Sequence, residues 1–224
     1  ARARPKRSTP VLGQRVACLW PVGLGVSDVQ YFEWFAPVYD LVVPEADRGD
    51  LALGLAAAEH PVGTVLDLGG GTGRAARVLA EDTAETAGKD VVVVDASHRM
   101  LEEARGTGLP AVQGDAGQVP MRENAVDAVV ITDALHHIPD REAALSEAAR
   151  VLKPGGVLVV RDFDPTTARG RLLAAGEHLF GLRSTFYSPD ELAARIGDAG
   201  LDARVLERGF GYTVVGVAPT TGTD

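Results

Sequence analysis

The residues most suited to chemistry in this chain form one glycine-rich segment, Asp67-Leu68-Gly69-Gly70-Gly71-Thr72-Gly73. It follows a short apolar run at 64–67 and precedes a stretch at 73–81 whose composition and spacing predict a helix. Glycines permit a tight turn and bring backbone N–H groups close to a ligand, and the start of the next helix adds partial positive charge. Because Gly71-x-Gly73-x-x-Ala76 also fits a dinucleotide fingerprint, the segment predicts a cofactor site of nucleotide type.

Three carboxylates favour S-adenosylmethionine over a nicotinamide dinucleotide as that cofactor. Asp95 ends a run of four valines, where a carboxylate can accept hydrogen bonds from both ribose hydroxyls. Asp115, in Gly114-Asp115-Ala116, follows the next strand and can accept from an adenine amino group. Asp67 would repel a diphosphate but attract the cationic amino group of an amino-acid cofactor. An NAD(P)-dependent oxidoreductase remains the alternative.

Apolar strands alternate with helices over most of the chain. Strands are predicted at 64–67, 91–94, 111–113, 126–132 and 157–160, and helices at 73–81, 97–106 and 140–152, the last closed by Lys153-Pro154-Gly155-Gly156. This alternation is typical of parallel βαβ units in a doubly wound sheet. Further helices are predicted at 166–182 and from Ser188 to Gly200, followed by a hairpin of strands at 203–208 and 212–217. We therefore expect an α/β fold that ends in antiparallel strands.

Residues 1–25 differ from the remainder of the chain. They contain five basic residues and no acidic one, they lack apolar periodicity, and Arg15 interrupts their only apolar stretch. A signal peptide needs a continuous apolar core, so none is expected here. We predict a basic, disordered extension at 1–25 and one domain over 26–224.

An aromatic helix is predicted at the start of that domain. Ser27-Asp28 can cap a helix over 29–39, which holds Tyr31, Phe32, Trp34, Phe35 and Tyr39 among the twelve aromatic residues of the chain. Such a helix packs on the core, and its aromatic density suits a ligand pocket as well. With the insertion at 172–187, which includes Phe180 and Phe186, it can form an apolar lid.

Taken together, the motifs resemble a known family. The segment at 67–73, Asp95, Gly114-Asp115-Ala116, Ile131–His137 and Arg150–Gly156 resemble, in order and spacing, a class I S-adenosylmethionine-dependent methyltransferase over residues 28–218. Phe35-Ala36-Pro37-Val38-Tyr39-Asp40 is similar to the ubiquinone/menaquinone C-methyltransferase type. Two departures from that type are Leu41-Val42-Val43-Pro44 in place of a Met-Asn pair and Arg161-Asp162 in place of a Glu.

The resemblance implies a Rossmann-like, doubly wound, seven-stranded sheet, mostly parallel with an antiparallel C-terminal hairpin. It implies that the loop glycines approach the methionine part of the cofactor, that Asp95 binds the ribose, and that Asp115 and the Ala116 N–H bind the adenine. Thr132 would lie beside the sulfonium, and Tyr39 would close the amino-acid end. The implied cofactor-binding residues are Tyr39, Asp67, Gly69, Gly71, Gly73, Asp95, Ala96, Asp115, Ala116 and Thr132.

His136 and His137 are the candidate catalytic residues. They are the only clustered histidines, and an imidazole near its ordinary pKa can take a proton from a phenol or enol acceptor. The competing interpretation is that the pair packs a turn and hydrogen-bonds the backbone. A metal site formed by His136, His137 and Asp140 is disfavoured because no second cluster completes it, so no metal is expected.

Charge and composition restrict the acceptor. Five of the 22 basic residues lie in 1–25, so the other 199 residues carry 17 basic against 31 acidic groups and disfavour a nucleic-acid partner. Cytosine C5 methylation needs a cysteine nucleophile and is excluded, because Cys18, the only cysteine, lies outside the domain. Methylation of amino groups on DNA bases is also disfavoured, because Asp133-Ala134-Leu135-His136 lacks the Pro-Pro-aromatic motif of those enzymes. No run of apolar residues is long enough for a membrane-spanning helix.

We therefore expect a cytoplasmic enzyme that methylates a small, hydrophobic, quinol- or phenol-like acceptor by in-line displacement, with peripheral access to a lipophilic substrate. A non-catalytic cofactor-binding protein on the same fold is the other alternative.

Overall fold

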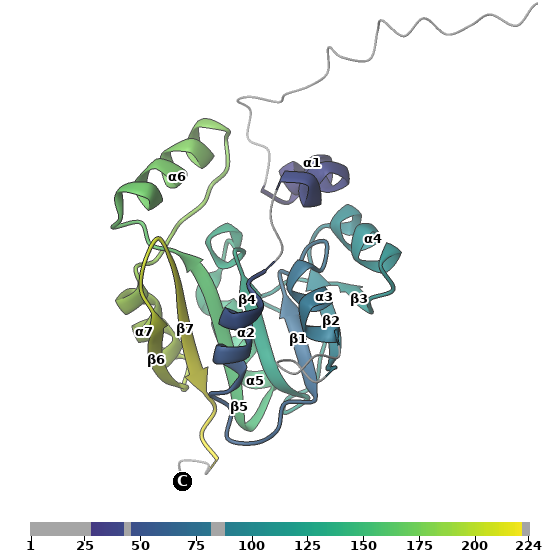
Figure 1. Ribbon diagram of the computed structural model, residues 1–224, viewed down its shortest axis with the longest axis vertical. Helices are drawn as coiled ribbons and strands as arrows, with labels where there is room; N and C mark the ends of the chain where they lie inside the picture. Colours follow the sequence, from purple (N-terminus) through teal and green to yellow (C-terminus); the bar gives the residue numbers. More distant parts are fainter. Residues whose placement is uncertain (1–27, 43–45, 82–87, 221–224) are drawn as a thin grey trace, which may run out of the picture.

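A seven-stranded sheet forms the centre of the computed structural model, which describes residues 28–42, 46–81 and 88–220 (Figure 1). The extension predicted at 1–25 lies outside the described residues. The strands are β1 (Thr64–Leu68), β2 (Asp90–Asp95), β3 (Ala111–Gln113), β4 (Val126–Thr132), β5 (Leu152–Phe163), β6 (Asp202–Glu207) and β7 (Gly211–Val217). Their order in the sheet is β3-β2-β1-β4-β5-β7-β6.

β1–β6 run in the same direction, and β7 alone runs opposite to them. β1 pairs in parallel with β2 and β4, β2 with β3, and β4 with β5, whereas β7 runs antiparallel to both β5 and β6. Valine, isoleucine and leucine runs such as 126–131 suit strands that are covered on both faces. The sequence-based fold class is confirmed, including the C-terminal hairpin.

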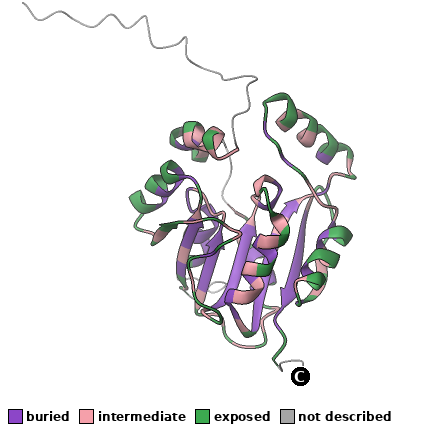
Figure 2. Ribbon diagram, turned by 180° about the vertical axis from the view of Figure 1, so that it is seen from behind, coloured by how far each residue is buried: buried purple, intermediate pink, exposed green. Residues whose placement is uncertain are grey.

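Helices cover both faces of the sheet, whose strands are the most buried part of the molecule (Figure 2). The helices are α1 (Asp28–Val42), α2 (Arg48–Leu55), α3 (Arg74–Ala80), α4 (His98–Gly106), α5 (Arg141–Val151), α6 (Ala168–Leu179) and α7 (Pro189–Asp198), with a 3-10 turn, η1 (Leu135–His137). Apolar side chains of α5 and α7 pack on one face of the sheet. Those of α2, α3 and α4 pack on the other. Residues alternate between these two cores along each strand, as a pleated sheet requires.

Hydrogen-bonding caps set the predicted helix starts. Ser97 Oγ accepts from the N–H of Met100 and Asp140 Oδ1 from that of Ala143, so both predicted caps are confirmed. Ser188 forms a reciprocal capping box with Glu191. Local side-chain chemistry alone thus determines where α4, α5 and α7 begin.

Three local features differ from the sequence expectations. α2 and η1 were not predicted, because each is short and carries little periodicity. Lys153-Pro154-Gly155-Gly156, predicted to close a helix, instead forms a bulge in β5: Val126 pairs with Leu152 and Ala128 with Val157. Strand pairing with β4 therefore outweighs the turn preference of these residues.

α1 and α6 lie at the same end of the sheet, beyond the carboxyl ends of the parallel strands (Figure 1). α1 is held by polar contacts: Thr72 Oγ1 donates to Asp40 at 2.5 Å, Arg77 pairs with Asp40 at 2.8 Å, and Ser97 Oγ donates to Glu33 at 3.0 Å. No helix within the described ranges is long and apolar enough to cross a membrane.

Candidate cofactor and acceptor site

A cavity opens where the carboxyl ends of β1, β2 and β4 face α1. Parallel α/β sheets characteristically bind ligands at this edge. The residues lining it include Asp28, Val29, Phe32, Tyr39, Asp67, Gly69, Gly70, Gly71, Arg74, Asp95, Ala96, Ser97, Met100, Gly114, Asp115, Ala116, Thr132, Asp133, Ala134, His137 and Ile138. Five of these are aspartates, so the cavity suits a ligand that carries positive charge and hydrogen-bond donors.

The glycine loop is shaped around Asp67. A Cβ atom at Gly70 would lie 2.5 Å from Asp67 Oδ2, so only glycine fits there. Asp67 Oδ2 accepts from the Ala76 N–H at 3.0 Å, which fixes the carboxyl under the first turn of α3. Its Oδ1 is buried and has no hydrogen-bond partner among the described residues.

Burial raises the pKa of Asp67 to about 7. A buried carboxyl with an unpartnered oxygen gains from a nearby cation, because the cation offsets the cost of burying the charge. The expected ammonium group of an amino-acid cofactor provides such a cation.

Asp95 joins the end of β2 to the glycine loop. Its Oδ2 accepts from the Gly71 N–H at 2.9 Å and its Oδ1 from the Ser97 N–H at 2.8 Å. Burial raises the pKa of Asp95 above its ordinary value although both amides stabilise its charge. The carboxylate is held rigidly in the cavity, at the position predicted for ribose binding.

The opposite end of the cavity is formed by the turn after β3. Asp115 Oδ1 accepts from the Gly117 N–H at 2.8 Å, which orients the carboxylate. Gly114 lies against Pro120 and Val94, where a Cβ would approach Pro120 Cδ to 3.0 Å. This turn lines the cavity, and the sequence predicts that it binds the adenine.

A buried arginine lies between Tyr39 and Asp133. The Arg74 guanidinium is 5.3 Å from the centre of the Tyr39 ring and 3.6 Å from Asp133 Oδ2. Asp133 directly follows β4 and has a φ of +53°, an uncommon conformation for a residue other than glycine. Arg74 is thus a cation at the start of α3 in an otherwise acidic cavity. In this position it can bind the carboxylate of a ligand.

His137 forms the wall of the cavity at α1. Its Nδ1 lies 3.2 Å from Asp28 Oδ2 and 3.2 Å from Ser184 Oγ, and the Phe32 ring meets it edge-on at 4.8 Å. Burial lowers the pKa of His137 below its ordinary value. Burial opposes the ionisation of Asp28, but hydrogen bonds from His137 and Arg183 hold its pKa below the usual range. A neutral imidazole paired with a carboxylate therefore faces the cavity.

His136 is buried behind its neighbour and does not line the cavity. Its Nδ1 is 2.6 Å from Asp162 Oδ1, its Nε2 is 3.7 Å from Glu177 Oε1, and the Phe186 ring stacks on it at 4.3 Å. Although burial opposes the charge, the carboxylates of Asp162 and Glu177 raise the pKa of His136. One nitrogen of each histidine and one Glu177 oxygen all lie within 4.8 Å of one another.

Comparison with known proteins agrees with this site. A family model for a methyltransferase domain matches residues 66–160, which contain the glycine loop, Asp95 and Asp115. This part of the chain is similar to methyltransferase domains, whose solved relatives include enzymes that use S-adenosylmethionine. The residues fit that cofactor: Asp67 for its ammonium, Arg74 for its carboxylate, Asp95 for its ribose and Asp115 for its adenine.

Individual relatives support the same family. A demethylmenaquinone methyltransferase of Renibacterium salmoninarum is 34% identical over 143 residues, 61% of this chain and 58% of that protein. An S-adenosylmethionine-dependent methyltransferase of Thermotoga maritima, described as a possible histamine N-methyltransferase, is 27% identical with a TM-score of 0.65, over 86% of this chain and 99% of that one. The DhpI–SAM–HEP complex is 27% identical with a TM-score of 0.62, over 86% of this chain and 96% of that one. The chain spans less than two thirds of the length of the curated relative.

The structure brings most of the predicted site residues together. Those that line the cavity are Tyr39, Asp67, Gly69, Gly71, Asp95, Ala96, Asp115, Ala116, Thr132 and His137. Gly73 does not: its φ is +80°, and a Cβ there would lie 2.6 Å from Leu109 Cδ1, so it serves helix packing. His136 is likewise absent from the lining.

Sequence reasoning missed Asp28, Arg74 and Glu177 as site residues. Asp28 was expected only as a helix cap. Arg74 directly follows the glycine loop at the start of a predicted helix, and this position could have indicated a site residue. Glu177 carries no local signal, because α6 reaches the histidines only through tertiary packing.

Proposed function

We propose that this domain transfers the methyl group of S-adenosylmethionine to a small, hydrophobic acceptor with an acidic hydroxyl, of the quinol or phenol class. The observation that carries the proposal is the position of His137. It lines the same cavity as the cofactor-binding carboxylates, with Asp28 on one of its nitrogens and the Phe32 ring against its edge. A polar group set in an aromatic wall suits an acceptor of this kind.

The cofactor supplies a methyl group on a sulfonium, which departs as a neutral thioether. The task of the chain is to align acceptor, methyl carbon and sulfur, and Asp67, Arg74, Asp95 and Asp115 hold the cofactor at four separate points. The new bond forms at the acceptor as the bond from methyl to sulfur breaks, and the acceptor hydroxyl gives its proton to the neutral His137 imidazole. Thr132, at the end of β4, lines the same cavity, and the resemblance implies that it lies beside the sulfonium.

The surroundings of the histidines suit a dry reaction. Phe32 packs on His137 and Phe186 packs on His136. An anionic acceptor and a sulfonium lose charge as they react, so the transition state is less charged than the separated reactants. An apolar wall therefore destabilises the reactants more than the transition state, and this lowers the barrier. His137 meets the acceptor hydroxyl, and His136 acts through its neighbour as a positioning residue.

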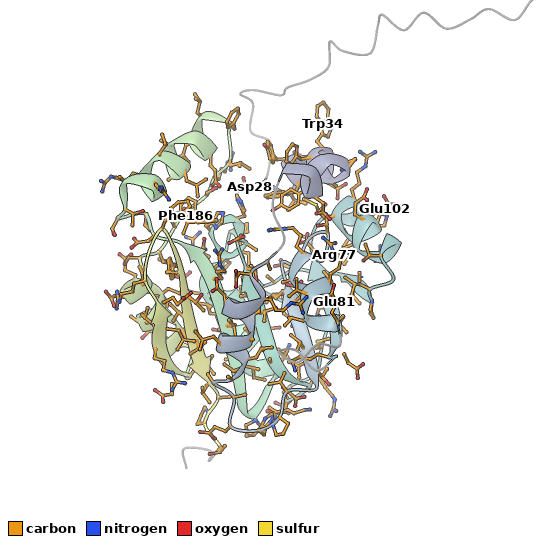
Figure 3. All side chains as sticks on the ribbon, viewed as in Figure 1. Asp28, Trp34, Arg77, Glu81, Glu102 and Phe186 are labelled. Carbon is orange, nitrogen blue, oxygen red and sulfur yellow. The ribbon has the colours of Figure 1, made fainter. Side chains whose placement is uncertain are left out.

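The approach to the cavity is also apolar. Trp34 of α1 is 60% exposed, and Leu172 and Leu179 of α6 are each 75% exposed. Figure 3 shows Trp34 pointing outward from α1, with Asp28 between α1 and α6 and Phe186 below α6. These two helices give a lipophilic acceptor a surface along which to reach the site. The demethylmenaquinone methyltransferase name of the relative is consistent with such an acceptor.

The test is a methyl-transfer assay with the full chain. S-adenosylmethionine labelled in its methyl group is incubated with a naphthohydroquinone, a simple catechol and histamine, and release of S-adenosylhomocysteine is measured. We expect turnover with the hydroxylated rings. His137→Gln should lose most of this activity, whereas His98→Gln, which replaces an exposed histidine on α4, should keep it. Turnover with histamine alone contradicts the acceptor class. Binding of NAD in preference to S-adenosylmethionine contradicts the reaction.

A further inference from the structure

Three potential metal ligands meet beside the proposed acceptor site. His136 and His137 come from η1 and Glu177 from α6, and one ligand atom of each lies within 4.8 Å of the other two. His136 Nε2 lies 3.7 Å from Glu177 Oε1. Ligand atoms around a tetrahedral ion with bonds of about 2.1 Å lie roughly 3.4 Å apart, so modest side-chain rotations complete the geometry.

Each histidine already has the second partner that metal-bound histidines usually have. Asp162 is 2.6 Å from His136 Nδ1, and Asp28 is 3.2 Å from His137 Nδ1. A carboxylate accepts from Nδ1–H, and this places the lone pair of the neutral ring on Nε2. For His136, that Nε2 is the atom nearest Glu177.

The third ligand has an unsatisfied atom. Glu177 Oε2 is buried and has no hydrogen-bond partner among the described residues. Asp28, Asp162 and Glu177 thus surround the two imidazoles with three carboxylates, while Tyr31 and Ser184 add neutral polar groups nearby. Burying an oxygen without a partner is costly, and a cation removes that cost.

We propose that His136, His137 and Glu177 bind a divalent transition-metal ion, of the kind that Zn²⁺ and Co²⁺ represent. Two nitrogens and one carboxylate suit such ions better than Mg²⁺ or Ca²⁺, which prefer oxygen ligands. From the sequence, a site of His136, His137 and Asp140 is disfavoured and no metal is expected; in the structure Glu177, not Asp140, completes the cluster with the two histidines. No redox step is involved.

The ion also gives the site a defined role, which rests on the function proposed above. Three protein ligands leave a coordination position open on the side of His137, which lines the cavity. With the ion bound, the acceptor hydroxyl oxygen would occupy that position instead of meeting His137 directly; its O–H bond would break and the proton would pass to water. The oxygen keeps the electron pair as a metal-bound oxyanion, which makes the acceptor nucleophilic near neutral pH.

The metal-free alternative is a protonated His136 that bridges Asp162 and Glu177. The two arrangements differ in what they bind. A protonated imidazole excludes a metal ion, whereas the proposed site takes up one ion for each chain.

The experiment titrates the full chain, freed of metal by chelation, with Co²⁺ and then Zn²⁺. Visible absorption of bound Co²⁺ and calorimetry of Zn²⁺ measure stoichiometry and affinity without use of enzyme activity. We expect one equivalent to bind, and binding to weaken by at least about tenfold in Glu177→Gln and in His137→Gln. Glu102→Gln is the matched control, because Glu102 also lies beside a histidine, His98, at 3.4 Å, but on the exposed face of α4 (Figure 3).

Absence of one-to-one binding to the native chain overturns the proposal, as does equal binding by Glu177→Gln and Glu102→Gln. Melting temperatures of both variants identify any unfolding, and His137→Gln provides an independent ligand variant if Glu177→Gln is unstable.

A parallel assay separates this inference from the proposed function. If S-adenosylhomocysteine release is equally fast with and without the metal, the catalytic role of the ion is wrong and the proposed function stands. If one ion binds but no hydroxylated ring is methylated, the proposed function is wrong and the metal site stands.

Discussion

Asp28 Oδ2 and His137 Nδ1 lie 3.2 Å apart although 109 positions separate the two residues in the chain. The contact joins the first turn of α1 to η1, which follows β4. Asp28 Oδ1 also accepts from the Arg183 N–H at 2.9 Å, so the same carboxylate links the segment after α6. One side chain therefore holds together three elements that surround the proposed acceptor site.

Replacing Asp28 by alanine should lower methyl transfer more than it lowers cofactor affinity. The variant removes the carboxylate that orients His137, and such partners commonly change activity by about 10–100-fold. The rate is measured as S-adenosylhomocysteine release, and the affinity by calorimetry.

Glu33→Gln is the control for Asp28→Ala. Glu33 also ties α1 to the domain, through Ser97 Oγ at 3.0 Å, but it does not contact His137. If the two variants lose the same activity, the effect comes from loosening of α1 and not from the orientation of His137.

Asp95→Ala should weaken S-adenosylmethionine binding by about 1.5–3 kcal/mol, because it removes charge-assisted hydrogen bonds to the ribose. Asp90→Ala, at the exposed start of the same strand, should leave the affinity unchanged. Isothermal calorimetry compares the two. An Asp95→Ala affinity equal to that of the native chain would show that this carboxylate only braces Gly71 and Ser97.

Cofactor affinity should rise with pH through the pKa of Asp67, which is about 7. Below that pH the carboxyl is protonated in the free protein, and binding of an ammonium group must release the proton. The observed binding constant should therefore increase by roughly tenfold between pH 6 and pH 8 and level off above. Asp67→Asn should remove this dependence; a native profile that is flat would contradict the assigned contact.

The same group affects folding in the opposite sense. The unfolded chain releases the Asp67 proton near pH 3.8, whereas the folded chain keeps it until about pH 7. Rising pH between these values therefore lowers the contribution of this residue to the free energy of unfolding. In Asp67→Asn the decline should be smaller, as measured by urea unfolding at pH 5 and pH 8.

Gly70→Ala should destabilise the domain and weaken cofactor binding together. The added Cβ would lie 2.5 Å from Asp67 Oδ2 and would displace the carboxyl that it covers. A loss of about 1–3 kcal/mol is expected. Gly197→Ala in α7, where a Cβ meets no atom within 4 Å, should be neutral or stabilising. Thermal unfolding and cofactor titration distinguish the two substitutions, and equal melting temperatures would contradict the packing argument.

Much of the architecture could be predicted from local patterns. The valine run at 91–94 and the apolar run at 126–131 form buried strands, and Ser97, Asp140 and Ser188 cap their helices as expected. The bulge at 153–156 could not be predicted, because its conformation follows from pairing with β4 and not from its own turn preference.

The cofactor end of the site was similarly accessible from sequence. Asp67, Asp95 and Asp115 each end or closely follow a strand, so a parallel sheet necessarily brings them to one edge. Gly73 fits the motif by its spacing, but it is not among the residues that line the cavity, and Leu109 fills the space beside it.

The acceptor end depended on tertiary structure. His136 and His137 are adjacent in sequence, yet one is buried against Asp162 and the other faces the cavity with Asp28. Glu177 reaches them from a helix 40 positions away. Strand and cap signals are local and survive in the sequence, whereas the partner, burial and charge of an imidazole are set by segments that meet only after the chain has folded.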